Sequence, residues 1–245
     1  MLRVNGVEIE DTFAEAFKMR AARAIVTAET AGWAHTAAAL ATGYATSVIG
    51  CDAEAGVEAD VPAGETPDGR PGVSLLVFGF NAAALGKALV NRVGQCVMTC
   101  PTTACFNGLV PGEETVKVGG LLRFFGDGHQ ASKKLDGRRY WRVPVMDGEF
   151  LCEDTFGIQR AVAGGNFLIL ARDQATALRA AEAAVRAIHA VYEIVIDGLD
   201  VGAVEAAMRA GVRAACVAGV VQISAGNYGG KLGQYPLHLH KILEA

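Results

Sequence analysis

A glutamate inside an apolar segment is the residue best suited to proton transfer. Glu193 lies in the run Val191–Asp197, whose β-branched and aromatic residues predict a strand. Because side chains alternate along a strand, Glu193 and Asp197 share one face, which we expect to be free of helices. A carboxylate partly shielded from water there would have a raised pKa and would suit acid/base catalysis. The alternative is an exposed strand residue without a role.

Several polar side chains lie at expected strand ends and in loops, where hydrogen-bond donors can bind a developing oxyanion or a carboxylate. For each of them the alternative is a cap or turn residue that satisfies local backbone groups. The predicted substrate-binding residues are Asn166, Ser224, Asn227 and Lys231 in the second half of the chain and Thr102, Thr103 and Asn107 in the first.

The glycine-rich run 226–233 resembles a phosphate-binding loop only superficially. A Walker A motif would need glycine at Ala225 and serine or threonine at Leu232. These glycines therefore predict tight turns, with a phosphate-bearing substrate tail near Lys231 as an option.

Cysteine and histidine residues do not form a recognisable catalytic or metal motif. Cys96, Cys100 and Cys105 have no adjacent His or Asp partner and predict buried packing. His238 and His240 share one side of a predicted strand but lack a third ligand. We expect no metal site.

Composition narrows the functional classes. The chain has 245 residues, is 51% hydrophobic and carries a net charge of -4 without a basic cluster, which argues against nucleic-acid binding. The six cysteines lack CxxC spacing, and no apolar run reaches the roughly 20 residues of a membrane span. The start of the chain does not resemble a signal peptide, so we expect a soluble cytoplasmic protein.

The first part of the chain predicts the order βαβ-βαβ. This order is that of the split-βαβ, ferredoxin-like unit. A short helix is expected within 7–17, with Asp11 or Thr12 as N-cap; strands are expected at 24–28, 46–50, 73–80 and 96–100, helices at 33–42 and 81–93, and a loop at 52–71.

Asp-Gly and similar turns separate short apolar runs in the middle of the chain and predict a β-meander. Its expected strands are 121–125, 139–143 and 150–153. A second lobe follows, with strands at 166–170, 191–197, 220–224 and 237–240 and helices at 173–189, capped by Asp173, and at 200–216. The predicted class is α+β, with ferredoxin-like lobes at 1–118 and 164–245 and the meander at 119–163.

One connection in the second lobe is too short. Only one or two residues separate the helix ending at His189 from the strand predicted at Val191. They reach about 7 Å, whereas the missing second strand would have to run back across a sheet of about 23 Å. We infer that a segment is missing between His189 and Ala190, with a different, truncated topology as the alternative.

Six segments carry a resemblance that covers nearly the whole chain. They are Val4–Phe17, Glu65–Val73, Pro101–Gly108, Phe124–Gly128, Ala163–Phe167 and Ile223–Gly233. With these segments the chain resembles the formylmethanofuran:tetrahydromethanopterin formyltransferases of methanogens and methylotrophs, including the form in a formyltransferase/hydrolase complex. One departure is that the family carries several dozen more residues between His189 and Ala190.

The resemblance implies an acyltransferase of one-carbon metabolism with two ferredoxin-like lobes. It would transfer a formyl group between methanofuran and N5 of tetrahydromethanopterin, which are carrier co-substrates, with no bound cofactor. The family's acid/base glutamate corresponds to Glu193. A homo-oligomer, a dimer or tetramer, and hydrolase-complex subunits are the implied partners.

Two alternatives belong to other functional classes. The first is a catalytically inactive binding or scaffolding subunit that has lost activity with the missing segment. The second is a small-molecule-binding regulatory protein, because the ferredoxin-like fold hosts many functions.

Overall fold

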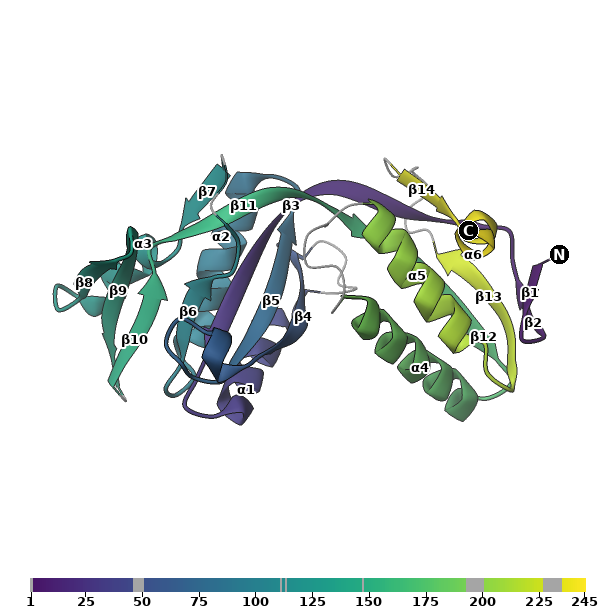
Figure 1. Cartoon of the computed structure of the whole chain (residues 1–245), viewed down its shortest axis with the longest axis horizontal. Coiled ribbons are helices and arrows are strands. Elements are labelled where there is room, and N and C mark those ends of the chain that lie inside the picture. The colour runs from purple at the N-terminus through teal and green to yellow at the C-terminus, as the bar shows by residue number, and fades with distance from the viewer. Residues whose placement is uncertain are drawn as a thin grey trace. The chain divides into compact units, whose positions relative to one another are not determined.

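The computed structural model describes residues 2–45, 51–110, 112, 114–146, 148–192, 201–226 and 235–245 (Figure 1). The chain forms two compact units. Met19–Arg160 makes the central unit, and Met1–Lys18 with Ala161–Ala245 makes the terminal unit. The first 18 residues thus belong with the end of the chain. The division of the chain into a first lobe at 1–118, a meander at 119–163 and a second lobe at 164–245 stays a prediction.

The central unit is built on a four-stranded antiparallel sheet with strand order β4-β5-β3-β6. This order and the βαβ-βαβ sequence of elements are those of the ferredoxin-like unit. Its elements are β3 (Phe13–Thr27), α1 (Ala31–Thr42), β4 (Glu54–Val61), β5 (Gly72–Gly79), α2 (Ala82–Arg92) and β6 (Ala104–Asn107). The predicted α+β class and the helices α1 and α2 are confirmed.

Four local predictions in the first 125 residues are wrong. The expected helix at 7–17 is instead β2 (Val7–Ile9) and the start of β3, and the expected loop at 52–71 contains β4. No strand forms at 96–100. The π-helix η2 (Val93–Val97) covers the first two of these residues, and a turn follows it. The expected strand at 121–125 is α3 (Gly119–Leu122) followed by the 3₁₀ helix η3 (Arg123–Gly126). The strand predicted at 46–50 lies outside the described residues.

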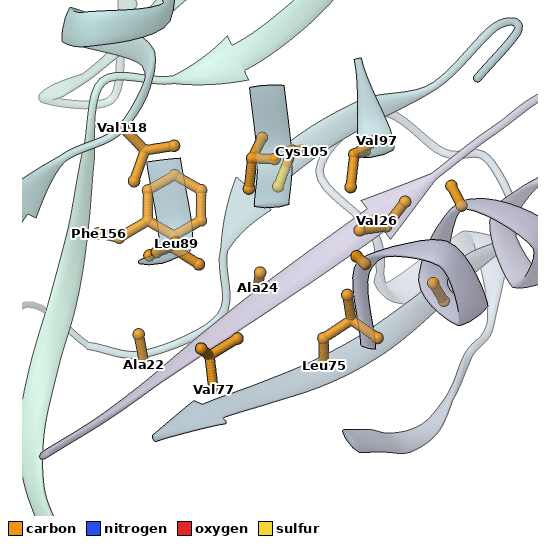
Figure 2. Close-up of a cluster of buried hydrophobic side chains, with 14 of the residues drawn as sticks. Ala22, Ala24, Val26, Leu75, Val77, Leu89, Val97, Cys105, Val118 and Phe156 are labelled. Carbon is orange, nitrogen blue, oxygen red and sulfur yellow. The ribbon is translucent and has the colours of Figure 1, made fainter. Parts of the chain in front are cut away.

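Small side chains let α1 pack closely on the central sheet. Ala24 and Val26 on β3 are buried on the same face as Leu75 on β5, and α1 presents a row of buried alanines to them. Figure 2 shows this cluster continuing towards Leu89 of α2 and Phe156. The other face of β3 carries Arg23, Ile25 and Thr27 because side chains alternate along the strand.

The meander extends the central sheet. Its strand β10 (Gly148–Glu153) pairs in parallel with β6 and antiparallel with β9 (Arg138–Val145), which pairs with β8 (Ala131–Leu135). Asp136 and Gly137 have φ of 50° and 80°, as the predicted hairpin turn requires. Two further strands, β7 (Glu114–Lys117) and β11 (Thr155–Gly164), pair with each other. The 3₁₀ turn η1 (Ala63–Glu65) follows β4.

The terminal unit has a sheet of order β1-β2-β13-β12 among the described residues. Its helices α4 and α5 pack on one face, where Phe167 and Ile169 of β12 and Ile223 of β13 point. The elements are β1 (Leu2–Val4), β12 (Asn166–Ala171), α4 (Gln174–Tyr192), α5 (Val201–Ala215), β13 (Val220–Gly226), β14 (Tyr235–His238) and α6 (Leu239–Glu244).

Helix α4 is longer than predicted. It continues through Val191 and Tyr192, so the strand expected from Val191 does not begin there. The rest of that strand lies outside the described residues. The last predicted strand also differs, because β14 begins at Tyr235 and the chain turns into α6 at Leu239, which places His240 on a helix. No helix in the described ranges is both long and apolar enough to cross a membrane.

Asp173 caps α4, as predicted, and makes the stability of this helix sensitive to acid. Its carboxylate accepts hydrogen bonds from the backbone N–H of Thr176 at 2.8 Å and from the Thr176 hydroxyl at 3.0 Å. These bonds, the backbone one foremost, lower the pKa of Asp173. A group with a lowered folded-state pKa stabilises the fold above its unfolded pKa of about 3.9, and this stabilisation is lost as pH falls through the folded value.

The substitution Asp173→Asn separates the cap from its charge. Asparagine keeps an acceptor oxygen but does not titrate. We expect the wild type to lose more thermal stability than Asp173→Asn as the pH falls below about 4. Melting temperatures measured by circular dichroism at a series of pH values test this, and parallel pH profiles for the two proteins would contradict it.

Candidate functional site

Two of the predicted substrate-binding residues lie on one open sheet face of the terminal unit. β12 and β13 are antiparallel, with Asn166 opposite Gly226 and Leu168 opposite Ser224. Asn166 and Ser224 therefore are diagonal neighbours on the face opposite α4 and α5. Asn166 is exposed and Ser224 is half-buried. We call this surface, with Leu168 and Leu170, the open face.

The open face combines polar groups with exposed apolar area. Leu168 and Leu170 are 54% and 57% exposed. Further along β13, Gln222 donates a hydrogen bond to Glu10 at 2.8 Å. An amide and a hydroxyl beside leucine side chains can hold the polar group of a ligand while its apolar part covers the leucines.

The three other predicted residues of this half lie outside the described residues. They are the acid/base candidate Glu193 and the substrate-binding candidates Asn227 and Lys231. Their roles stay predictions.

Thr103 and Asn107 use their side chains within the central unit. The Thr103 hydroxyl lies 2.6 Å from the carbonyl oxygen of Val97, and the Thr103 side chain is buried. Asn107 is also buried; its Oδ1 accepts from the N–H groups of Leu109 and Gly157, at 3.2 and 3.0 Å, and its amide donates to the Leu109 carbonyl. Both residues thus satisfy local backbone groups, which is the alternative that the sequence left open.

Thr102 lies at the surface in a strained backbone conformation. Its φ is 62°, which is rare for a β-branched residue. The Thr102 hydroxyl oxygen accepts a hydrogen bond from the backbone N–H of Glu29 at 3.2 Å, and its carbonyl accepts one from Arg70 at 2.5 Å. Backbone strain of this kind gathers at functional sites.

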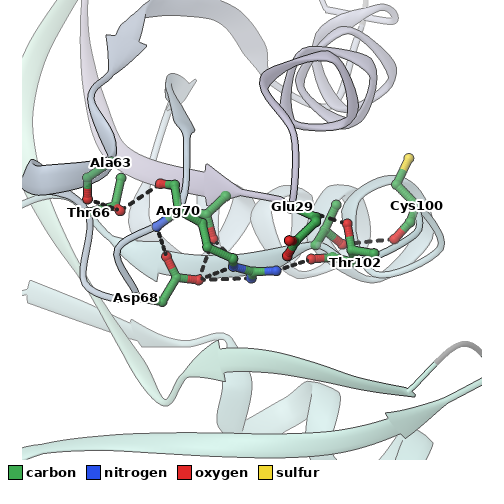
Figure 3. A network of polar contacts seen from close by, with 9 residues as sticks. Glu29, Ala63, Thr66, Asp68, Arg70, Cys100 and Thr102 are labelled. Carbon is green, nitrogen blue, oxygen red and sulfur yellow. Dashed lines mark hydrogen bonds and ion pairs between the residues drawn. The ribbon is translucent and has the colours of Figure 1, made fainter.

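A polar network missed by the sequence reasoning surrounds Thr102 (Figure 3). Arg70 and Asp68 form an ion pair with 2.8 Å between them, and the Thr27 hydroxyl donates to Asp68 at 2.7 Å. The signal in the sequence was an acidic and a basic residue two positions apart in the turn Pro67–Pro71. The turn residues predict only a loop, because the partners Thr27 and Thr102 are distant in the sequence.

Two largely buried carboxylates of the central unit, those of Glu58 and Glu153, are paired with arginines. Glu58 binds Arg23 through two contacts of 2.6 and 2.7 Å, and the carboxylate of Glu153 binds Arg138 in the same forked manner. The hydrogen bond to Glu153 raises the pKa of Arg138, against the opposing effect of burial. These carboxylates are bound as ion pairs, which makes them poor candidates for moving a proton.

Four cysteines lie in environments that raise their pKa and so disfavour the thiolate: Cys51, Cys100, Cys152 and Cys216. Burial raises the pKa of Cys152 well above its usual value and that of Cys216 to about 11. A nucleophilic or metal-binding cysteine needs the opposite shift. In the described part of the chain, no three His, Cys, Asp or Glu side chains gather as a metal site would require.

The two histidines near the C-terminus make separate contacts within the terminal unit. His238 packs against the ring of Phe13, with 5.6 Å between the centroids. The Nε2 of His240 lies 3.0 Å from the Ile9 carbonyl oxygen, so this ring connects α6 to β2.

Comparison with known proteins gives matches along both units. The family model described as formylmethanofuran-tetrahydromethanopterin formyltransferase matches residues 2–145, and the model of its proximal lobe matches 148–191 and 187–242. A formylmethanofuran–tetrahydromethanopterin formyltransferase from Methylococcus capsulatus is 47% identical over 296 residues, covering 98% of this chain and 99% of the relative.

Two solved structures are similar along almost their whole length. The formyltransferase/hydrolase complex from Methylorubrum extorquens with methylofuran contains a chain with a TM-score of 0.88 and 41% identity, covering 99% of this chain and 98% of that one. The formyltransferase from Methanosarcina barkeri has a TM-score of 0.86 and 42% identity, covering 98% of this chain and 100% of that one.

The relatives are longer than this chain. The alignment with the Methylococcus capsulatus protein spans 296 positions, whereas this chain has 245 residues, so roughly fifty positions of that alignment have no residue of this chain. The two matches of the proximal-lobe model meet within residues 187–191, where the sequence predicts the missing segment. With both lobes matched and the identity this high, the chain belongs to the formylmethanofuran–tetrahydromethanopterin formyltransferase family.

Proposed function

We propose that this protein transfers a formyl group between methanofuran and N5 of tetrahydromethanopterin in one-carbon metabolism. The observation that carries the proposal is the family match along both units, from residue 2 to residue 242. It favours the enzyme over an inactive scaffolding subunit, since the relatives of comparable similarity are named as formyltransferases.

The reaction is a direct acyl transfer between two nitrogens. In the direction from methanofuran, N5 attacks the formyl carbon, the bond from that carbon to the methanofuran nitrogen breaks, and one proton passes from N5 to that nitrogen. The reaction therefore needs donors for the carbonyl oxygen and a group that moves the proton. Both carriers supply their own reacting nitrogen, so no bound cofactor takes part in this scheme.

We assign the proton transfer to Glu193 and substrate binding to Asn166, Ser224, Asn227, Lys231 and Thr102. Support for Asn166 and Ser224 comes from their shared place on the open face, and for Thr102 from its strained, exposed turn. Thr103 and Asn107 receive no direct role, because their side chains bind backbone groups.

The proposed setting is a cytoplasmic homo-oligomer, a dimer or tetramer, with hydrolase subunits as further partners. All six cysteines are unpaired thiols, as in a reducing compartment. A relative of this chain is a formyltransferase/hydrolase complex subunit. Light scattering of the purified protein tests the oligomer, and a monomeric mass would contradict it.

Asn166→Ala should raise the KM for one of the two carriers about tenfold, as expected for the loss of one hydrogen bond to the substrate. The protein should keep its melting temperature because Asn166 is exposed. A matched control is Gln222→Ala, which removes an amide from the same face of β13 and should leave both KM values unchanged. Equal effects of the two substitutions would contradict the assignment of Asn166.

The proposed function is tested by a steady-state absorbance assay with both purified carriers. We expect turnover that requires formylmethanofuran and tetrahydromethanopterin together and ceases when either is omitted. Absence of turnover, under conditions in which the Methylococcus capsulatus relative is active, would overturn the proposal.

A further inference from the structure

The conformation of Thr102 is unfavourable for its residue type. At φ 62° the threonine lies in the left-handed region, where a β-branched side chain crowds its own backbone. Glycine or asparagine would adopt this φ more easily. A threonine at this exposed position must therefore be held there by its neighbours.

Two neighbours contact Thr102: the backbone N–H of Glu29 donates to its hydroxyl, and Arg70 holds its backbone. One guanidinium nitrogen donates to the Thr102 carbonyl oxygen at 2.5 Å. The same guanidinium group donates to Asp68 from Nε at 2.9 Å and lies 3.3 Å from the Thr27 hydroxyl. Because Asp68, Thr27 and Thr102 all contact the planar guanidinium group, the orientation of the nitrogen that faces Thr102 is fixed.

Asp68 is held in turn by the end of β3 and by its own turn. The Thr27 hydroxyl donates to Asp68 Oδ2 at 2.7 Å, and the backbone N–H of Arg70 donates to Oδ1 at 3.3 Å. On the other side of the turn, the Thr66 hydroxyl lies 2.7 Å from the Arg70 carbonyl oxygen. Figure 3 shows these contacts running from Thr66 through Arg70 to Thr102.

We propose that Arg70 is a positioning residue, which holds Thr102 in the left-handed conformation in which Thr102 contacts a carrier substrate. This inference rests on the proposed function. It adds a residue that does not itself touch the substrate and that acts through the backbone of Thr102. Asp68 and Thr27 orient the guanidinium group of Arg70 and so contribute to the same positioning of Thr102.

A double-mutant cycle tests the inference, with Arg70→Gln, Thr102→Ala and the double variant. We expect each single variant to raise the KM for the same carrier about tenfold, with kcat within about twofold of the wild type. In the double variant the loss of Arg70 should add little, because Thr102→Ala has already removed the side-chain contact with the carrier that Arg70 positions through the Thr102 backbone. Arg70→Lys should give an intermediate KM, since one ammonium group does not match the fork.

Arg20→Gln is the control. Arg20 also forms a forked ion pair, with Glu114, and its side chain is 26% exposed against 27% for Arg70. This variant should leave both KM values unchanged and should be additive with Thr102→Ala. Melting temperatures identify any variant that fails to fold, in which case Arg70→Lys and Asp68→Asn carry the test.

The outcomes separate the inference from the function it rests on. An active wild type in which Arg70→Gln and Thr102→Ala change KM additively, or for different carriers, would overturn the inference and leave the proposed function standing. An inactive wild type would overturn both. A crystal structure of Arg70→Gln in which Thr102 keeps its positive φ would overturn the inference irrespective of activity.

Discussion

Glu193→Gln should lower the kcat of formyl transfer by about 100-fold to 10,000-fold, which is the usual contribution of general acid–base catalysis. Glutamine has nearly the same shape and hydrogen-bonding reach as glutamate but cannot exchange a proton. The proton that leaves N5 would then depend on water. KM for both carriers should change little, because the lost interaction acts mainly in the transition state.

The pH profile of this variant distinguishes chemistry from binding. In the wild type, the dependence of kcat on pH should contain a limb that reports the ionisation of Glu193, and this limb should disappear in Glu193→Gln. Glu205→Gln on α5 is a matched control that should keep both the rate and the profile. A kcat of Glu193→Gln within about twofold of the wild type would remove the role assigned to Glu193.

Asn107→Ala should lower the free energy of unfolding by about 2–5 kcal/mol, since each buried polar group left without a partner costs about 1–3 kcal/mol. The substitution removes the acceptor for the N–H groups of Leu109 and Gly157 and the donor to the Leu109 carbonyl. These groups connect the end of β6 to β11, so their loss should loosen the central unit.

Urea unfolding followed by circular dichroism measures this change. Asn166→Ala is the control, because the same substitution at an exposed position should cost less than about 0.5 kcal/mol. Asn107→Ala should thus lower the free energy of unfolding, whereas Asn166→Ala should raise the KM for a carrier. A stable Asn107→Ala protein with a raised KM would show that Asn107 binds substrate after all.

Local sequence signals sufficed where they agreed with the tertiary environment. Asp173 caps α4 as predicted, the helix predicted from Asn81 is α2 with Asn81 as its cap, and the Asp136-Gly137 turn joins β8 to β9. The residues of β5 are mainly apolar and include two valines, and the predicted bounds of this strand, 73–80, differ from the observed ones by one residue at each end. Each of these features is decided by groups within a few residues of one another.

The predictions failed where distant pairing decides the conformation. Phe13–Lys18 consists mainly of residues that favour helices, yet it forms a strand because β14 pairs with it from more than 200 residues away. β4 has charged and glycine residues but completes the sheet beside β5. The apolar run near Cys96 has the composition of a strand and instead closes the helix α2 as a π-helical turn.

The candidate site was predictable in residue type but not in orientation. Asn166 and Asn107 are both asparagines at strand ends, and only the fold shows that one is exposed on a sheet face and the other is enclosed by backbone groups. Arg70 was missed because its importance comes from Thr102, which is 32 residues further along the chain.

The most direct test follows the formyl carbon itself. Formylmethanofuran labelled with ¹³C in the formyl group is mixed with an equal amount of tetrahydromethanopterin and the wild-type protein, and the label is followed by NMR. We expect the signal to move from the methanofuran nitrogen to N5 of the pterin without passing through free formate. A label that stays on methanofuran, or that appears as formate, would contradict direct formyl transfer.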